Sequence, residues 1–298
     1  MPTTRPGKSI RRVTKPSSRE FEGVTLLKCA SSPTSDCRSE VLENYRATFS
    51  KPYNALALDY DGTLVSLFNR TGKLSRAIVS SIGNFLNSKI PIVIISGRGE
   101  SLLRLRRQLC KFELGTLFLA MHNGAEIVDA KSGGLIRREK QIGFSLNRAF
   151  ERLSQNPHIM QGTVKITQKP YSIQMQVKER SMLQLDELCR WASTVLSPGL
   201  IVRSSGYAVD IYPRSRMKDY CLPLLNEHLE MQMNFIRIGD QGHELGNDFE
   251  LLNRRGGFSV GTVSADRRSC FPVVDEAGNR LLGVKGSIHL LNRTFQPL

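Results

Sequence analysis

A short apolar run that ends in two acidic residues constrains this chain more than any other feature. Residues 54–64 read NALALDYDGTL, so Asp59 and Asp61 stand one residue apart. A run this short, closed by an Asp-Gly turn signal, predicts a buried strand of a parallel sheet. Ligands of open α/β sheets bind beyond the carboxyl ends of the strands. The pattern therefore predicts a site here, although one Asp-Gly pair is also an ordinary turn.

Strand and helix patterns alternate on both sides of a central interruption. Apolar runs at 90–95 and 116–121 are typical of buried strands, and residues 74–88 have helical spacing. Beyond the interruption, residues 234–238 and 258–262 again predict strands. Further helices are expected at 39–49, near 100–109, at 216–230 and at 287–292. This alternation predicts an α/β fold with a doubly wound parallel sheet.

The interruption, residues 127–210, has a different periodicity. Residues 163–167 and 172–178 alternate strictly between apolar and polar side chains, which predicts an antiparallel hairpin with one buried face. A second hairpin is expected at 200–212, and helices at 143–154 and 181–196 can cover the apolar face. We therefore expect a core formed by 21–126 and 211–298, into which an α+β cap domain is inserted.

The net charge of +15 is partly local. Residues 1–20 carry six basic side chains and only one acidic side chain, that of Glu20. They also contain three prolines, so we expect a disordered basic tail. A basic body attracts anions in general, including nucleic acid and phosphorylated metabolites. However, no nucleic-acid reading module and no basic stripe interleaved with aromatic residues is present, which argues against a nucleic-acid-binding protein.

Composition and cysteine usage bound the remaining classes. No apolar stretch reaches the roughly 20 residues that a membrane-spanning helix needs, and the first residues lack the apolar centre of a secretory signal. We therefore expect a cytoplasmic protein without a membrane partner. The six cysteines show no paired metal-ligand spacing, and we expect them to be reduced.

Four features lie at or near the ends of the predicted core strands. They are Asp59 with Asp61, then Ser96, then Lys218, then Asp240 with Asn247 and Asp248. In this order, with a cap inserted after the third strand, they resemble the four motifs of the haloacid dehalogenase-like (HAD) hydrolase superfamily over residues 52–298. The insertion point and the α+β module resemble subclass IIB, with a cap of type C2B, which contains sugar phosphatases and the eukaryotic phosphomannomutases.

The likeness to phosphomannomutases extends further in two places. Residues 209–222 resemble the third motif of that family, and the six residues between Asp240 and Asn247 resemble the spacing of its fourth motif. The arginine-rich substrate segment of the mutases is absent, because residues 163–178 contain lysines but no arginine.

The resemblance implies a role for each matched residue. Asp59 would be the nucleophile that forms an aspartyl-phosphate, and Asp61 the general acid and base. Mg²⁺ suits an all-oxygen site, and the expected metal ligands are Asp59, Asp61 (through its backbone), Asp240 and Asp248. Phosphate-binding residues would be Ser96, Gly97, Lys218 and Asn247. Substrate contacts are expected from Asp210, Arg98, Lys165, Gln174, Gln176 and Arg203.

Two enzymatic interpretations follow from this constellation. The first is an Mg²⁺-dependent phosphatase that hydrolyses a small phosphorylated metabolite, most simply a sugar phosphate. The alternative is a phosphosugar mutase of the phosphomannomutase type, which keeps the phosphate on the sugar. The sequence predicts neither the substrate nor the oligomeric state.

Overall fold

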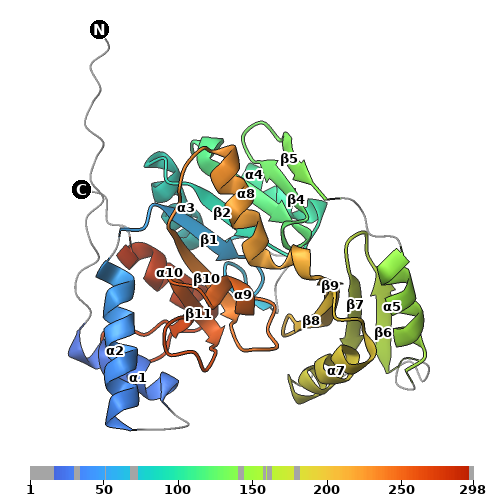
Figure 1. The fold of residues 1–298 in the computed structure, drawn as a ribbon. Helices are drawn as coiled ribbons and strands as arrows, with labels where there is room; N and C mark the ends of the chain where they lie inside the picture. The colour runs from blue at the N-terminus through green and yellow to red at the C-terminus, as the bar shows by residue number, and fades with distance from the viewer. Residues whose placement is uncertain are drawn as a thin grey trace.

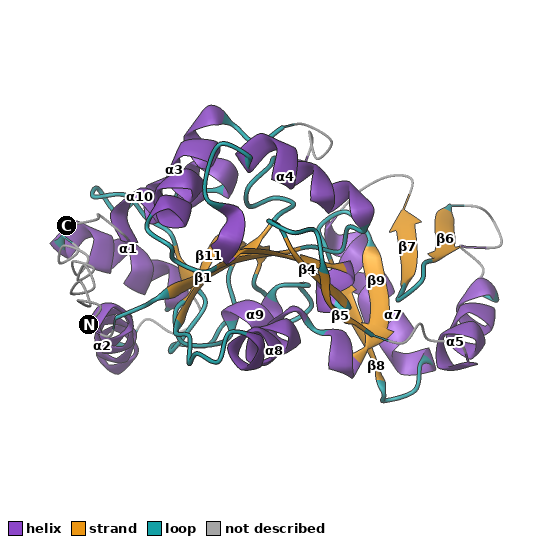
Figure 2. Ribbon diagram, turned by 90° about the horizontal axis from the view of Figure 1, so that it is seen from above, coloured by secondary structure: helices purple, strands orange, loops and turns teal. Residues whose placement is uncertain are grey.

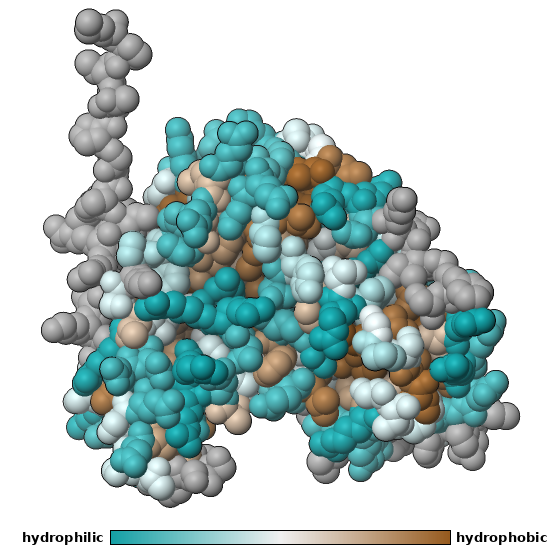
Figure 3. All heavy atoms as spheres, viewed as in Figure 1, coloured by the Kyte–Doolittle hydropathy of each residue, from teal (hydrophilic) through white to brown (hydrophobic). Residues whose placement is uncertain are grey.

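The computed structural model of the chain describes residues 17–29, 34–50, 52–67, 73–139, 144–156, 159, 163–177 and 182–294. Its larger part is a sheet covered by helices, and a smaller module with its own sheet lies beside it (Figure 1). Hydrophilic residues cover most of the face seen in Figure 3, with smaller apolar areas over both parts. Among the described helices, none is long and apolar enough to cross a membrane.

The core sheet has eight strands, of which six run parallel. Its strand order is β12-β11-β10-β1-β2-β3-β4-β5. The parallel strands are β1 (Ala55–Asp59), β2 (Ile92–Ile95), β3 (Leu117–Met121), β10 (Phe235–Gln241), β11 (Gly257–Thr262) and β12 (Phe271–Pro272). All five residues of β1 are buried, and the strand pairs with β10 and β2 on its two sides. The predicted central strand and the α/β fold class are confirmed.

Helices cover both faces of this sheet, as Figure 2 shows edge-on. One apolar cluster joins the sheet to α3 (Arg76–Asn87), α4 (Arg104–Leu109) and α10 (Gly283–Thr294). A second cluster on the opposite face contains α8 (Cys221–His228) and α9 (Phe249–Leu252). The alternate residues of β1 divide between the two, with Leu56 and Leu58 in the first and Ala55 and Ala57 in the second.

The inserted module begins and ends later than expected. β4 (Glu126–Asp129) and β5 (Leu135–Arg138) pair antiparallel with β3 and with each other, so they extend the core sheet. The predicted cap start at 127 therefore falls inside a core strand. The predicted return at 211 falls inside β9 (Val209–Pro213), which belongs to the module. Four-residue strands that continue a sheet by hairpins carry too little periodicity to be assigned from sequence.

The module is an antiparallel sheet with helices on one face, as the alternation predicted. Its strand order is β6-β7-β9-β8, formed by β6 (Val164–Gln168), β7 (Ile173–Val177), β9 and β8 (Leu200–Ser204). The apolar side chains of these strands pack against α5 (Phe144–Ser154) and α7 (Met182–Val195). The polar residues Gln174 and Asp210 lie on the opposite face. This sheet is the cap of the expected fold.

A helical hairpin precedes β1. It consists of α1 (Ser18–Lys28), which was not predicted, and α2 (Ser35–Ser50), which contains the helix expected at 39–49. Ser17 caps α1 by accepting from the backbone N–H of Glu20, whose side chain accepts in return from the N–H of Ser17. The disordered tail was expected to extend to residue 20. The capping box instead begins α1 at Ser18, so the helix overlaps the last residues of the expected tail. Residues 1–16 lie outside the described part of the chain.

The cysteines differ from the expectation in one respect. Cys29 and Cys37 form a disulfide between α1 and α2, with a Cα–Cα distance of 6.3 Å. The expectation of six reduced cysteines is therefore wrong for this pair, because the packing of α1 against α2 brings them within bonding distance. The remaining cysteines are free, and only Cys110 is exposed.

Candidate active site

Three carboxylates from two adjacent strands meet at one point of the core. Asp59 ends β1, Asp240 lies in β10 and Asp248 follows in the next loop. One oxygen of each lies within 4.8 Å of one oxygen of each of the others, and all three residues are buried. β1 and β10 are neighbouring parallel strands, so their carboxyl ends bring Asp59 and Asp240 together although 181 positions separate them.

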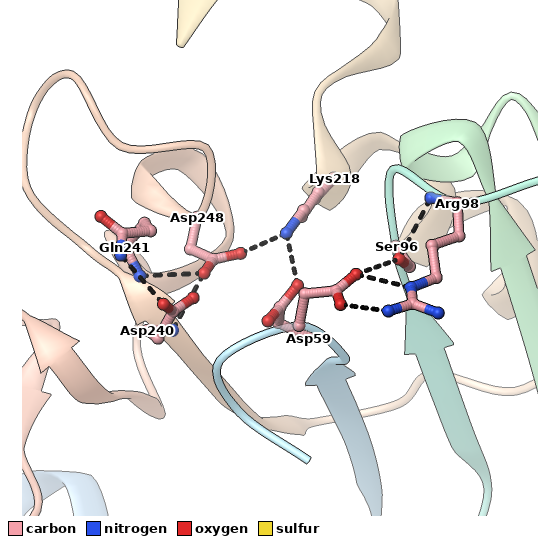
Figure 4. A network of polar contacts seen from close by, with 8 residues as sticks. Asp59, Ser96, Arg98, Lys218, Asp240, Gln241 and Asp248 are labelled. Atoms are coloured by element: carbon pink, nitrogen blue, oxygen red, sulfur yellow. Dashed lines mark hydrogen bonds and ion pairs between the residues drawn. The ribbon is translucent and has the colours of Figure 1, made fainter. Parts of the chain in front are cut away.

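Lys218 completes this cluster from a 3-10 turn that precedes α8. Its Nζ donates to Asp59 Oδ1 and to Asp248 Oδ1, each at 2.6 Å (Figure 4). The exposed fraction of its side chain is 1%, and those of Asp59 and Asp248 are 4% and 0%. Three buried carboxylates thus face one ammonium group.

The excess of negative charge perturbs the pKa values of these groups. Burial, and then the charge of Asp248, raise the pKa of Asp59 to about 7 despite the neighbouring Lys218. Burial and the charges of Asp59 and Asp248 raise the pKa of Asp240 well above its usual range. Burial alone would lower the pKa of Lys218, but Asp248 and Asp59 together raise it. The cluster therefore favours an additional cation.

Asp248 also fixes the end of β10, which carries Asp240. Its Oδ2 accepts from the backbone N–H groups of Asp240 and Gln241, both at 3.0 Å. Gln241 in turn donates its side-chain amide to Asp240 Oδ2 at 2.9 Å. Gly62, at a φ of +85°, packs so closely on Asp240 that a Cβ at this position would collide with its carboxylate. These contacts hold Asp240 in one orientation.

Asp61 is turned toward a different partner. Its carboxylate accepts from Arg98 Nε at 2.9 Å and from Arg98 Nη2 at 2.7 Å, and lies 3.4 Å from Ser96 Oγ. The guanidinium of Arg98 also lies over the ring of Tyr60. The Asp61 carboxylate is therefore not part of the three-carboxylate group, and Arg98, which we expected to contact substrate, holds Asp61. Ser96 and Gly97 lie beside this pair at the end of β2.

The expected cap residues separate into three groups. Gln174 donates to Asp210 Oδ1 at 2.8 Å, and Gln176 donates to Gln174 Oε1 at 3.0 Å, which makes one polar network on the cap sheet. Lys165 is exposed and outside this network. Arg203 pairs with Glu250 in α9, so it ties the cap to the core, and the substrate contact expected for it stays a prediction.

The cap also contacts the loop between Asp240 and Asp248 through its backbone. Ser204 N–H donates to Leu245 O at 2.6 Å, and Asn247 N–H donates to Ser204 O at 2.9 Å. Asn247, expected to bind phosphate, thus contacts the end of β8. In the β8–β9 turn, Gly206 lies against the side chain of Gln241. The cap therefore rests directly on the loop between Asp240 and Asp248.

A second cap contact was not predicted. Tyr171, in the β6–β7 turn, is buried, and its hydroxyl donates to Glu126 Oε1 at 2.6 Å. Its ring also lies 5.0 Å from that of His122 and under the guanidinium of Arg216. An aromatic residue in a hairpin turn, where polar residues are usual, was the available signal.

Comparisons with known proteins agree with this architecture. Neither a protein-family model nor a curated protein sequence matches the chain. An N-terminally truncated, IMP-bound IMP-nucleotidase from Plasmodium falciparum has a TM-score of 0.62 at 13% identity, over 92% of this chain and 79% of that one. A haloacid dehalogenase-like hydrolase from Bacteroides thetaiotaomicron has 0.52 at 19%, over 82% and 100%.

A third solved structure shares the type of cap. It is a sugar phosphatase of HAD subclass IIB, with a TM-score of 0.53 at 14% identity, over 72% of this chain and 90% of that one. The mostly parallel central sheet and the separate antiparallel cap sheet correspond to this group. The chain therefore has the fold of the haloacid dehalogenase superfamily phosphatases, with the cap arrangement of subclass IIB.

Proposed function

We propose that the protein is an Mg²⁺-dependent phosphatase that hydrolyses a small phosphorylated metabolite through an aspartyl-phosphate on Asp59. The convergence of Asp59, Asp240 and Asp248 on Lys218 carries this proposal. Phosphoryl transfer depends mainly on positioning and on neutralising charge. This site has a buried carboxylate beside a fixed lysine, at the strand ends of an open sheet. It therefore provides both the positioning and the charge neutralisation.

The donor set fits a divalent cation. Asp59 Oδ2 is buried and has no hydrogen-bond partner within the described residues. Asp59 and Asp240 are the most available ligands, since both oxygens of Asp248 already accept hydrogen bonds, and the backbone carbonyl of Asp61 is a further candidate. Mg²⁺ prefers such oxygen donors and, when bound, would offset the negative charge of the phosphoryl group and of the nucleophile.

The residues of the chain divide the chemistry between them. Asp59 attacks phosphorus while the bond from phosphorus to the leaving oxygen breaks, and Lys218 neutralises the equatorial oxygens. Asp61, oriented by Arg98, gives its proton to the leaving oxygen. Asp61 then takes a proton from the water that attacks the aspartyl-phosphate, which releases phosphate and regenerates Asp59. The Ser96 hydroxyl and the Gly97 N–H hold phosphoryl oxygens.

The cap network favours a hydroxyl-rich leaving group. Asp210, Gln174 and Gln176 offer a carboxylate and two amides, which suit sugar hydroxyls. Burial raises the pKa of Asp210 and the charge of Lys218 is among those that oppose the rise, which supports a position of the network near the site. The mutase alternative lacks the arginine-rich substrate segment of that family, because residues 163–178 contain lysines but no arginine. Hydrolysis of a monophosphate is therefore the better-supported reaction.

The test is a panel of phosphorylated metabolites, including hexose phosphates and nucleoside monophosphates, incubated with Mg²⁺ and with a chelator. We expect release of inorganic phosphate that requires Mg²⁺ and is lost in Asp59→Asn. Conversion of one hexose phosphate into its isomer without phosphate release would favour the mutase. Phosphate release by Asp59→Asn at the wild-type rate would contradict the nucleophile assignment.

Substrate class has its own test. Asp210→Asn keeps the shape of the cap network and removes its charge. For a polyol phosphate, we expect kcat/KM to fall roughly tenfold, about the effect of one hydrogen bond to a charged group. Hydrolysis of a small aryl phosphate without hydroxyl groups serves as the matched control and should be unchanged. An equal loss on both substrates would argue against a role in specificity.

A further inference from the structure

The turn after β3 adopts a costly backbone conformation beside the phosphate-binding loop. His122, Asn123 and Gly124 have φ values of 52°, 59° and 94° in succession. A left-handed conformation costs about 1 kcal/mol or more for a residue with a Cβ, although asparagine tolerates it better than most. Two consecutive non-glycine residues in this region therefore indicate that the turn is held by its surroundings.

This conformation directs two backbone groups at the loop after β2. Asn123 N–H donates to Ser96 O at 2.8 Å, and His122 N–H donates to Arg98 O at 2.8 Å. The end of β3 thus holds both sides of Gly97. The N–H of Gly97 itself makes no hydrogen bond within the part of the chain that the structure describes. The loop is therefore fixed with one free donor at its centre.

The side chain of Asn123 lies against this free position. Its Oδ1 and Nδ2 are 3.5 Å and 3.9 Å from the point that a Cβ of Gly97 would occupy. The residue is 7% exposed, and its carboxamide has no hydrogen-bond partner among the described residues. Oδ1 is sealed from solvent, whereas Nδ2 is not. In the described part of the chain, Nδ2 is therefore an unpaired donor that a ligand beside Gly97 can reach.

We infer that Asn123 is a substrate-contacting residue, which donates its Nδ2 group to a phosphoryl oxygen beside the Gly97 N–H and the Ser96 hydroxyl. This inference rests on the proposed phosphatase function and adds a donor from a third strand of the sheet. β1, β2 and β3 are consecutive neighbours, so their carboxyl ends line one edge. In this arrangement the strained turn positions the Nδ2 group of Asn123, which donates a hydrogen bond to the phosphoryl group.

Two substitutions separate the side chain from the backbone. Asn123→Gly removes the carboxamide and accepts the positive φ without strain, whereas Asn123→Ala removes the carboxamide and adds strain. We expect Asn123→Gly to melt near the wild-type temperature and Asn123→Ala to melt lower. Both should weaken the binding of inorganic phosphate, measured by calorimetry with Mg²⁺, by roughly 10–100-fold, with a parallel fall in kcat/KM.

The outcomes separate this inference from the proposed function. If the wild-type protein binds inorganic phosphate and Asn123→Gly binds it equally well, the carboxamide does not contact the ligand and the inference is overturned. If Asn123→Gly fails to fold, the carboxamide belongs to the fold, and the inference is again overturned. If the folded wild-type protein with Mg²⁺ neither binds phosphate nor releases it from any phosphate ester, the proposed function itself fails.

Discussion

Two buried lysines of this protein differ in almost every respect except their burial. Lys218 is 1% exposed and donates to two carboxylates of the candidate site. Lys28, in the helical hairpin before β1, is 6% exposed and donates to the backbone carbonyls of Ser264, Asp266 and Ser269 at 2.8–2.9 Å. The first is surrounded by formal charges, and the second mainly by dipoles.

The difference appears in their proton affinities. Burial lowers the pKa of Lys28 to about 8, since the surrounding negative charges, such as Asp266 and Glu244, compensate only part of the desolvation. For Lys218 the two carboxylates outweigh the same penalty and raise the pKa. A lysine that must remain charged for catalysis therefore needs carboxylates beside it. A lysine that joins a helix to a loop does not.

The largest expected effect is on catalysis by Lys218→Met. Removal of the ammonium leaves Asp59 and Asp248 without their cation, and the transferring phosphoryl group loses a fixed positive charge. We expect kcat to fall by about 10³-fold, which is the usual loss when one electrostatic stabiliser of a transition state is removed. Steady-state hydrolysis of the best substrate measures it. A Lys218→Met variant with wild-type kcat would show that Lys218 is not needed for catalysis.

Lys28→Met should show the opposite profile. Three carbonyls lose their donor, so we expect the free energy of unfolding to fall by roughly 1–3 kcal/mol while kcat stays within a factor of about two. Urea unfolding and the same activity assay measure the two quantities. Lys285→Met, at an exposed position of α10, is the matched control and should change neither. A loss of activity in folded Lys28→Met would show that the hairpin serves the site.

The smallest expected effect is the pH dependence of stability. Lys28 has a folded pKa of about 8 and an unfolded value near 10.5, so the unfolded chain binds more protons between these pH values. The contribution of this group to stability therefore rises with pH across that window. Between about pH 7.5 and about pH 9.5 we expect the wild type to gain roughly 1–2 kcal/mol relative to Lys28→Met. Parallel pH profiles of the two proteins would contradict the lowered pKa.

The strands could be predicted from the sequence, whereas the burial of the two lysines could not. The buried run ending at Asp59 and the alternation at 163–178 predicted β1 and the cap hairpin, because hydrophobic periodicity reports burial directly. A single lysine has no periodicity, and its usual place is the surface. Lys218 was identified only through its order among the four motifs. Lys28 belongs to no motif and was missed.

The features that the sequence did not predict have a common cause. The cap boundary, the partner of Arg203 and the pairing of Cys29 with Cys37 all depend on which distant segment lies beside a residue. Asn123 is a further case, because Asn-Gly in the sequence indicates only a turn. The positive φ values and the unpaired carboxamide appear only when β2 and β3 lie side by side. No local pattern reports such neighbours.

The sequence by itself determined the buried strands, the alternation of strand and helix, and the residue types that the chemistry needs, since these follow from burial and from the oxygen donors that a cation prefers. Only the tertiary structure decided which charges share a desolvated space. It brought Asp59 to Lys218 and turned Asp61 toward Arg98. Interactions between charges depend on distance and on exclusion of water, and both are set by packing between segments far apart in the chain.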